Sequence, residues 1–352
     1  MRIEDVETPA VLVDLDRVEA NILRAQRHFD ALGKGFRPHI KTHKIPYLAR
    51  LQIQAGAIGI ACQKISEAEV FASEDFSGIL LCFNLLSDEK IARARHLAER
   101  ERLTVVADNA EVVARLSAGM AGAANPLRVL VECDTGMGRC GVQNPQQAFD
   151  LARLISDAKG LRFGGFMTYP KPNNEAGVEA FLSEARDLCL SDLGPCEVIS
   201  SGGTPSMVLV GQSPCITEYR AGTYIYNDRS LIARGSCGVT DCALTVLTTV
   251  VSRPTADRGV LDAGSKSLTS DLLGLTGYGM IPAYAHAEII GLSEEHGHLD
   301  LRLCSARPKI GEKLQVIPNH ACPVSNLVDQ VVFHRGDKVI RFEDVAARGC
   351  VL

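Results

Sequence analysis

The sequence predicts a (β/α)8 TIM barrel followed by a mostly β C-terminal domain, and three observations support this α/β fold class. From residue 36 to 222, short apolar or β-branched runs alternate with longer amphipathic segments, which is the order of a parallel sheet covered by helices. After about residue 243, strand-like runs continue without long helices between them. The first strand-like run is not followed by a GxGxxG turn, so a doubly wound open sheet is the second choice.

Strand-like runs of the barrel region are rich in Val, Ile and Leu, and there are eight of them, as the fold requires. They span 36–41, 57–63, 77–83, 103–108, 127–133, 161–169, 196–203 and 215–222. Between them lie segments rich in Ala, Glu and Arg that favour helices. These helix-like segments include 65–74, 87–101, 109–120, 144–158 and 173–190.

The C-terminal part has a different pattern from the barrel region, because turns rich in Gly, Pro and Asp, and not helices, separate its strand-like runs. These runs span 243–254, 259–265, 283–293, 298–304, 312–318 and 329–346. We therefore expect a barrel over residues 21–243, and a β domain made of residues 1–20 and 244–352.

Composition excludes several classes of protein. With 46% apolar residues, 22% charged residues and a net charge of −5, the chain is neither disordered nor basic, so nucleic acid is not an expected partner. No apolar run reaches the roughly 18 residues that span a bilayer, so no membrane partner is expected. The N-terminus lacks the features of a secretory signal, and the twelve cysteines are scattered without a CxxC pair. We expect a cytoplasmic protein with reduced cysteines.

Polar residues gather where the predicted barrel strands end, which is where barrel enzymes place their chemistry. Lys41 alternates with His39 and His43 on the first predicted strand, so the three should share one face. Cationic neighbours lower the pKa of such a lysine, which can then form a Schiff base. Taken alone, this segment is better explained as a basic surface loop.

Two glycine-containing turns lie at the same end of the predicted barrel. Ser-Gly-Gly-Thr at 201–204 and Gly-Thr-Tyr at 222–224 offer backbone N–H groups suited to a phosphate. One such turn alone indicates no more than a change of chain direction. A lysine and two phosphate-binding turns at one barrel end together favour pyridoxal 5′-phosphate as the cofactor.

A second candidate site lies in the β domain, where His320 and Cys322 follow each other at i and i+2. In extended chain the two side chains point to the same side. An imidazole and a thiolate suit Zn²⁺ best among divalent metals. As an isolated pattern, a buried structural cysteine beside a hydrogen-bonded histidine explains the pair better, although Pro318, Asn319 and Pro323 indicate a shaped loop.

Several motifs in order resemble those of a known family. They are TPAVLVDLDRVEANI, RPHIKTHK, GIACQKISEAE, VECDTGMGRCGV, SGGTPS, EYRAGTYIYND, LDAGSKS, SEEHG and PNHACP. Together they resemble the fold-type III pyridoxal-phosphate enzymes with an alanine-racemase-like barrel, in the D-threonine aldolase and D-serine dehydratase group. The resemblance covers nearly the whole chain and implies a barrel with a β domain and a homodimer.

The resemblance also implies a role for individual residues. Lys41 would carry the Schiff base, Arg139 would lie near the cofactor's phenolic oxygen, and Gln63 and Tyr169 would line the pocket. Of these, Lys41, Arg139 and Tyr169 are the expected catalytic residues. The phosphate would be held by a set of small and hydroxyl residues: Ser201, Gly203, Thr204, Gly222, Thr223 and Tyr224. His320 and Cys322 would bind a divalent metal beside the substrate, with Zn²⁺ favoured and Mn²⁺ or Mg²⁺ as alternatives.

The implied activity is a lyase reaction on β-hydroxy-D-amino acids. Our first expectation is the D-threonine aldolase type, which gives glycine and an aldehyde. The alternative is a D-serine or D-3-hydroxyaspartate dehydratase, which gives a keto acid and ammonia. An amino-acid racemase and a non-catalytic pyridoxal-phosphate carrier are less favoured, because neither would use the metal pair.

Three departures from the family pattern leave the reaction and the substrate side chain open. His-x-Cys is the dehydratase form of the metal pair, whereas aldolases carry His-x-Asp. The residues after the pair, from Pro323 to Asp329, look more like the aldolase pattern. Tyr169-Pro170-Lys171 stands where aldolases have Tyr-His-Gly. The sequence also does not identify the group that faces the pyridine nitrogen.

Overall fold

The computed structural model describes residues 1–100 and 103–352, which form two compact units. The barrel unit consists of Ala25–Lys41, Pro46–Gly222 and Cys350–Leu352. The β unit consists of Met1–Arg24, Thr42–Ile45 and Thr223–Gly349. Each unit contains one eight-stranded sheet.

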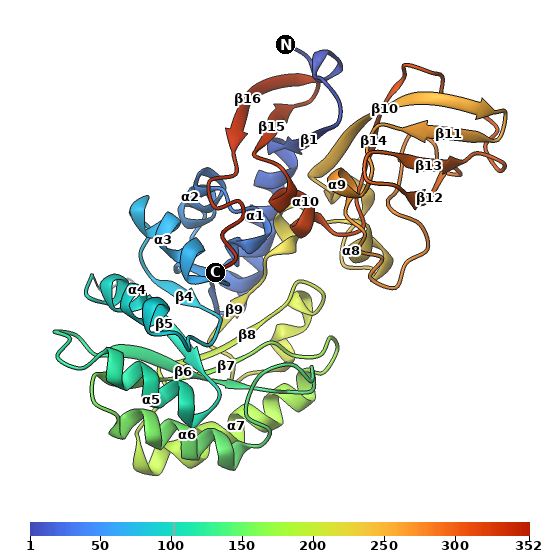
Figure 1. The fold of residues 1–352 in the computed structure, drawn as a ribbon. Helices are drawn as coiled ribbons and strands as arrows, with labels where there is room; N and C mark the ends of the chain where they lie inside the picture. The colour runs from blue at the N-terminus through green and yellow to red at the C-terminus, as the bar shows by residue number, and fades with distance from the viewer. Residues whose placement is uncertain (101–102) are drawn as a thin grey trace. The chain divides into compact units, whose positions relative to one another are not determined.

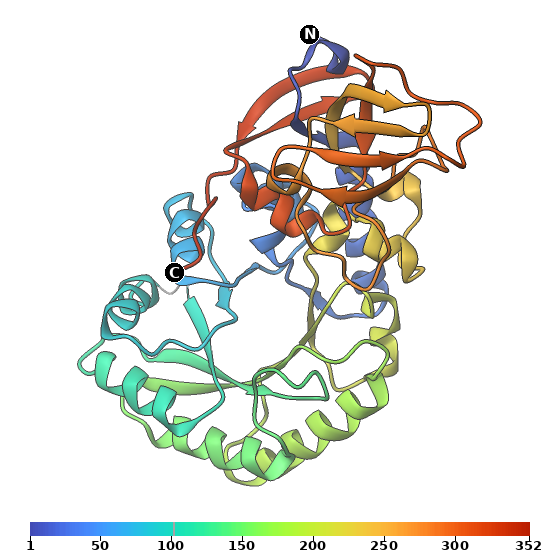
Figure 2. The same ribbon diagram turned by 45° about the vertical axis from the view of Figure 1, so that its right-hand side comes forward.

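The sheet of the barrel unit is parallel throughout and curls strongly (Figure 2). Its strand order is β2-β9-β8-β7-β6-β5-β4-β3. The strands are β2 (Gly35–Phe36), β3 (Ile60–Cys62), β4 (Ile79–Leu81), β5 (Leu103–Ala107), β6 (Leu127–Cys133), β7 (Leu161–Thr168), β8 (Val198–Gly202) and β9 (Glu218–Arg220). The two edges meet through a parallel bridge between His39 and Ala61 and a hydrogen bond from Ala61 N to Pro38 O of 2.8 Å.

Helices cover the outer face of this sheet (Figure 1). They are α2 (Pro46–Gln54), α3 (Ile65–Ser73), α4 (Asp88–Ala98), α5 (Ala110–Gly119), α6 (Pro145–Asp157) and α7 (Glu175–Asp192). Local sequence fixes several starts, since Ser87, Asn109 and Asn144 cap α4, α5 and α6 by accepting a backbone N–H.

Seven of the eight strand-like runs of the barrel region contain a strand, whereas the run 36–41 shares only Phe36 with β2. All five helix-like segments overlap a helix, so the alternation of strands and helices is confirmed. The predicted helix 87–101 ends at Ala98, and residue 101 lies outside the described residues. The prediction did not assign α2 or α1 (Leu15–Ala31). In α1 the buried residues recur at helical spacing (Leu15, Val18, Ile22, Ala25 and Phe29), a signal that would have identified it.

The β unit contains a mostly antiparallel sheet with the order β12-β13-β11-β10-β1-β15-β16, in which β14 also pairs with β10. The strands are β1 (Ala10–Asp14), β10 (Leu244–Thr255), β11 (Arg258–Leu261), β12 (Glu288–Leu292), β13 (Gly297–Asp300), β14 (Lys313–Val316), β15 (Gln330–Arg335) and β16 (Lys338–Asp344). Short helices α8 (Arg229–Ala233), α9 (Ser265–Leu268) and α10 (Ala321–Leu327) complete the unit.

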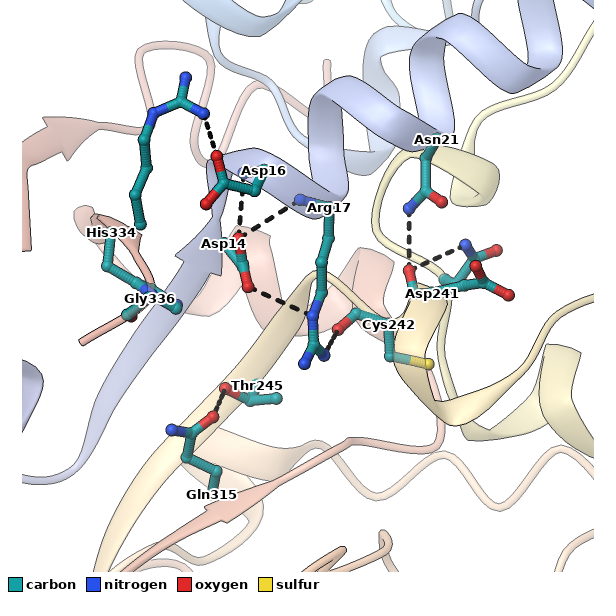
Figure 3. Close-up of polar contacts among 12 residues, drawn as sticks. Asp14, Asp16, Arg17, Asn21, Asp241, Cys242, Thr245, Gln315, His334 and Gly336 are labelled. Atoms are coloured by element: carbon teal, nitrogen blue, oxygen red, sulfur yellow. Dashed lines mark hydrogen bonds and ion pairs between the residues drawn. The ribbon is translucent and has the colours of Figure 1, made fainter. Parts of the chain in front are cut away.

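The N-terminal strand belongs to this second sheet. β1 lies between β10, to which it is antiparallel, and β15, to which it is parallel, and Val6, Leu12, Leu247 and Val332 form a buried cluster there. Polar contacts hold the start of α1 in the same unit (Figure 3). Arg17 donates to Cys242 O at 2.8 Å, and Asn21 Nδ2 donates to Asp241 O at the same distance.

Among the helices of the described residues, none has both the length and the apolar character needed to cross a membrane.

Candidate cofactor and metal sites

Two layers of side chains point into the barrel. The lower layer is apolar and contains Ala61, Leu80, Val106, Leu130 and Met167. Because side chains alternate along a strand, the residue two positions further on points the same way. In the second layer this rule places Glu132, two positions beyond Leu130 within β6. Gln63, Asp108 and Tyr169 directly follow the last residues of β3, β5 and β7. Polar residues therefore stand at the carboxyl ends of the strands, next to the apolar layer.

A buried ion network lies at β8, β9 and the end of β7. Arg37 Nη2 pairs with Glu218 at 2.8 Å, and Ser200 Oγ donates to Glu218 at the same distance. Arg220 donates to Ser200 Oγ and, at 2.8 Å, to Thr168 O. Burial alone would raise the pKa of Glu218, but the Arg37 charge and these hydrogen bonds lower it. The network fixes the Arg220 guanidinium as a buried cation inside the barrel.

The chain around Lys41 differs from the prediction. β2 ends at Phe36, and residues Ile40–Thr42 form one turn of 3₁₀ helix. The prediction that His39, Lys41 and His43 share one strand face was therefore wrong, because the chain leaves the extended conformation after Pro38. Lys41 is half-buried. Its backbone N–H donates to Nδ1 of His39, two residues earlier, at 3.4 Å.

His39 is a neutral side chain in this setting. Its imidazole is 9% exposed, and burial together with the charges of Lys41, Arg220 and Arg139 holds its pKa well below the usual range. Within the described part of the chain, Nε2 of His39 is buried without a hydrogen-bond partner. Gln63, whose side chain donates to Cys82 O at 2.8 Å, also interacts with the ring.

Arg139 lies on the loop that follows β6. Asp134 organises this loop by accepting from the backbone N–H groups of Gly136 and Gly138, at 2.9 and 3.1 Å. Burial alone would raise the pKa of Asp134, but these N–H groups lower it. The Arg139 guanidinium lies over the Tyr169 ring, 4.8 Å from its centre. The structure thus brings these two predicted catalytic residues into direct contact.

The Ser-Gly-Gly-Thr segment begins inside β8, which ends at Gly202, and its last two residues follow the strand beside Tyr169. Gly203 has a φ of +114°, which L side chains rarely adopt, and a Cβ built there would lie 3.5 Å from the Tyr169 ring. Thr204 is buried next to it. Ser200 directs its hydroxyl to the interior network, so Ser201 faces the opposite side of β8, in register with Tyr219. The predicted Ser201 side chain is therefore not brought together with the others.

These residues fit pyridoxal 5′-phosphate. A lysine stands beside a neutral imidazole with an unpartnered buried nitrogen, an arginine stacks on a tyrosine, and a glycine with positive φ exposes backbone at the same strand ends. Gly222, the other predicted phosphate residue of this unit, directly follows β9 and Ala221. The barrel unit holds the predicted residues Lys41, Gln63, Arg139, Tyr169, Ser201, Gly203, Thr204 and Gly222.

The β unit holds Thr223, Tyr224, His320 and Cys322. The predicted extended chain at the metal pair was wrong, because α10 starts at Ala321 and His320 is its N-cap residue. His320 itself keeps an extended conformation, with φ −140° and ψ 105°, and its side chain still reaches that of Cys322 in the first helical turn. The two donor groups therefore meet despite the different backbone.

Hydroxyl groups surround the Cys322 sulfur. Thr42 Oγ1 lies 3.2 Å and Thr223 Oγ1 3.4 Å from Sγ. Burial alone would raise the pKa of Cys322, but His320 and these two hydroxyls lower it. The Thr223 hydroxyl thus contacts the thiol, and Tyr224 beside it is buried.

Two carboxylates hold His320 in place. Asp271 Oδ2 lies 2.7 Å from Nδ1 of His320, which leaves Nε2 as the ring nitrogen for the Cys322 thiol or a metal. Asp228 is fully buried and accepts from the backbone N–H of Ala321 at 3.1 Å, which fixes the start of α10. Burial alone would lower the pKa of His320, but Cys322, Asp271 and Asp228 raise it to about 9.

The pair fits a divalent metal as two of its ligands. An imidazole oriented by a carboxylate and a thiol with a lowered pKa are donors typical of Zn²⁺ sites. In the residues that the structure describes, no group of three His, Cys, Asp or Glu side chains could hold a metal. A metal held by this pair would keep positions for water or substrate, as catalytic rather than structural zinc does.

Sequence reasoning missed three charged residues of the candidate sites. Arg220 and Glu132 lie inside strand runs, where a charged side chain that faces the core marks a buried and paired charge. Asp271 lies in a long loop, 49 residues from His320, and only the fold brings them together.

Comparisons with known proteins give a match to the region of the barrel unit and another to the region of the β unit. Residues 13–230 match the family model for the alanine racemase N-terminal domain, and residues 243–334 match a putative serine dehydratase domain. A D-threonine aldolase from Arthrobacter sp is 33% identical over 357 residues, covering 98% of this chain and 93% of that protein.

Solved structures are similar over the same length. The D-threonine aldolase from Filomicrobium marinum has a TM-score of 0.90 at 32% identity, covering 100% of this chain and 98% of that one. A cysteine-to-alanine variant of D-threo-3-hydroxyaspartate dehydratase, solved in the metal-free form, has a TM-score of 0.87 at 27% identity, covering 98% and 99%.

Proposed function

The chain belongs to the alanine racemase N-terminal domain family, and from this premise we propose that it is a pyridoxal-phosphate- and metal-dependent lyase of the D-threonine aldolase type. Its substrates would be β-hydroxy-D-amino acids, cleaved to glycine and an aldehyde. The bound cofactor would supply an electron sink for the carbon next to the amine. The metal would supply a Lewis acid for the β-hydroxyl group.

We assign the chain's own residues as follows. Lys41 would hold the cofactor through its side-chain amine and would act as the base that takes and returns protons. Arg139, held over Tyr169, places its charge near the phenolic oxygen. Backbone N–H groups at Thr204 and Gly222 would bind the phosphate; the N–H of Gly203 donates to Arg220 O at 2.7 Å, so Gly203 would contribute close approach of its backbone instead. His39, kept neutral beside Lys41, and the buried cation Arg220 would set the charge around the cofactor.

The observation that carries the lyase assignment is the His320–Cys322 pair with Asp271 at Nδ1 of the histidine. Thr42 and Thr223 are the residues that follow Lys41 and Gly222 in sequence, and both place a hydroxyl on the Cys322 sulfur. A racemase or a cofactor carrier has no use for such a donor pair.

Dehydration is the second candidate, and a specific observation favours it. The metal pair is His-x-Cys, and it lies within the segment that matches a putative serine dehydratase domain. In that case the base at Lys41 would remove the proton from the α-carbon, and the β-hydroxyl would leave with the help of the metal.

Product analysis tests the proposal. Purified protein would be supplied with cofactor and Mn²⁺ or Zn²⁺ and incubated with D-threonine, D-serine or D-threo-3-hydroxyaspartate. Glycine plus an aldehyde identifies an aldolase, and ammonia plus a keto acid identifies a dehydratase. Racemisation without cleavage would contradict both.

Three expectations from the sequence remain proposals: a cytoplasmic homodimer, a barrel over 21–243 with a β domain of 1–20 and 244–352, and Zn²⁺ as the metal. Light scattering on the purified protein tests the dimer, and metal analysis of protein purified without chelators tests the metal.

A further inference from the structure

Glu132 is a charged residue to which the proposed function gives no role. It is the last but one residue of β6 and is 4% exposed. It lies two positions beyond Leu130 of the apolar layer and in register with Met167 of β7, so its side chain points into the barrel. A carboxyl buried in this way carries a cost unless it is paired.

Its partner is Arg139. Nη2 of Arg139 lies 4.0 Å from Glu132 Oε1, and the guanidinium lies over the Tyr169 ring, 4.8 Å from its centre. Arg139 thus contacts both a carboxyl from β6 and an aromatic ring that follows β7. Its side chain is 48% exposed. Backbone contacts alone therefore leave it free to turn to solvent.

The loop between the two residues is closed at its base. Val142 N donates to Glu132 O at 2.9 Å, and Asp134 N donates to Val142 O at 3.0 Å. Gly141 N donates to Asp108 Oδ2 at 3.0 Å. These bonds fix where the Arg139 backbone stands, and its side chain contacts Glu132, the Tyr169 ring and the side chain of Cys140.

Several charged or titratable groups face Glu132. Burial raises its pKa to about 7; Arg139 on its own loop and Arg220 of β9 lower it, whereas Asp108 after β5 and Asp134 raise it. The thiols of Cys82, Cys133 and Cys140 lie within its electrostatic reach. The carboxyl therefore changes charge close to neutral pH.

We propose that Glu132 is a positioning residue for Arg139. Its ionised carboxylate draws the guanidinium into the barrel mouth against Tyr169, and protonation releases that hold. The inference rests on the proposed function, in which Arg139 faces the phenolic oxygen of the cofactor. It adds that the affinity for the cofactor depends on the charge of Glu132, and therefore on pH, which the family resemblance does not imply.

The test measures the dissociation constant of pyridoxal 5′-phosphate between pH 6 and 8.5 for the wild type, Glu132→Gln and Glu132→Asp. Glu184→Gln, an exposed glutamate on α7, is the matched control. We expect cofactor binding by Glu132→Gln to be roughly tenfold weaker at pH 8 and equal to wild type near pH 6, as for a lost buried charge pair. Glu132→Asp should restore part of the affinity, and the control should match the wild type.

A double-mutant cycle with Arg139→Met separates positioning from a general structural effect. If Glu132 acts through Arg139, adding Glu132→Gln to Arg139→Met should change cofactor affinity less than twofold. An undiminished tenfold effect in that background would overturn the inference, as would a Glu132→Gln profile identical to wild type. Wild-type protein that fails to form a borohydride-reducible bond with the cofactor would instead overturn the proposed function together with this inference.

Discussion

Replacing Glu132 with glutamine should change how the stability of the protein depends on pH. The carboxyl has a pKa of about 7 in the folded chain, against an ordinary value of 4.5. Between these values the folded state holds a proton that the unfolded state has lost, so the free energy of unfolding falls as pH rises. The difference corresponds to about 3 kcal/mol, because one pKa unit is worth roughly 1.4 kcal/mol.

The glutamine amide does not bind or release a proton in this pH range, so the variant lacks this contribution to the pH dependence. The free energy of unfolding of Glu132→Gln, relative to wild type, should therefore rise by about 3 kcal/mol from pH 4.5 to pH 8. If the amide also changes the free energy of unfolding by an amount that does not depend on pH, that amount is the same at pH 4.5 and at pH 8. The difference between the two pH values is then unaffected.

The assay is urea unfolding at a series of pH values, followed by circular dichroism. It uses protein stripped of cofactor and metal, because ligands that bind only the folded state add their own free energy. Glu184→Gln on the exposed face of α7 should track the wild type throughout. If the free energy of unfolding of Glu132→Gln differed from that of wild type by the same amount at every pH from 4.5 to 8, the raised pKa of Glu132 and the burial argument behind it would be refuted.

Further predictions concern the two candidate sites. Lys41→Ala should lose the Schiff-base absorbance near ~420 nm; a borohydride-trappable band that persists in this variant would rule out Lys41. Exhaustive chelation should stop turnover and leave that band in place, and activity that survives it would exclude a catalytic metal. Cys322→Ser should bind the cofactor normally and lose bound metal by elemental analysis. Asp271→Asn should weaken metal binding by roughly 10–100-fold in a competition titration, whereas Asp187→Asn on α7 should not; equal affinities would show that Asp271 does not orient His320.

The barrel could be predicted from the sequence because its signal is local. Each strand is a short apolar run, and caps such as Ser87 and Asn144 mark the next helix. The Lys41 segment could not be predicted from alternation, because β2 ends at Phe36 and the chain turns into a 3₁₀ helix at Ile40. The alternation of side chains between two faces holds only along a regular strand, and Lys41 lies after the end of one.

The site was predictable only in part, for a related reason. The family motifs identify Lys41, Arg139, His320 and Cys322, but not what surrounds them. Asp271 reaches His320 from a distant loop, and the charge of Glu132 is decided by burial together with groups from three other segments. Such effects depend on three-dimensional packing and have no signature at a fixed sequence spacing.

The central claim is that this chain cleaves β-hydroxy-D-amino acids, and proton NMR of a D-threonine digest tests it most directly. Protein supplied with pyridoxal 5′-phosphate and metal should convert D-threonine to glycine, seen as its methylene singlet, together with acetaldehyde. The same sample with Lys41→Ala should remain unchanged. D-Threonine that stays intact with the loaded wild-type protein, or that appears only as its epimer, would contradict the account.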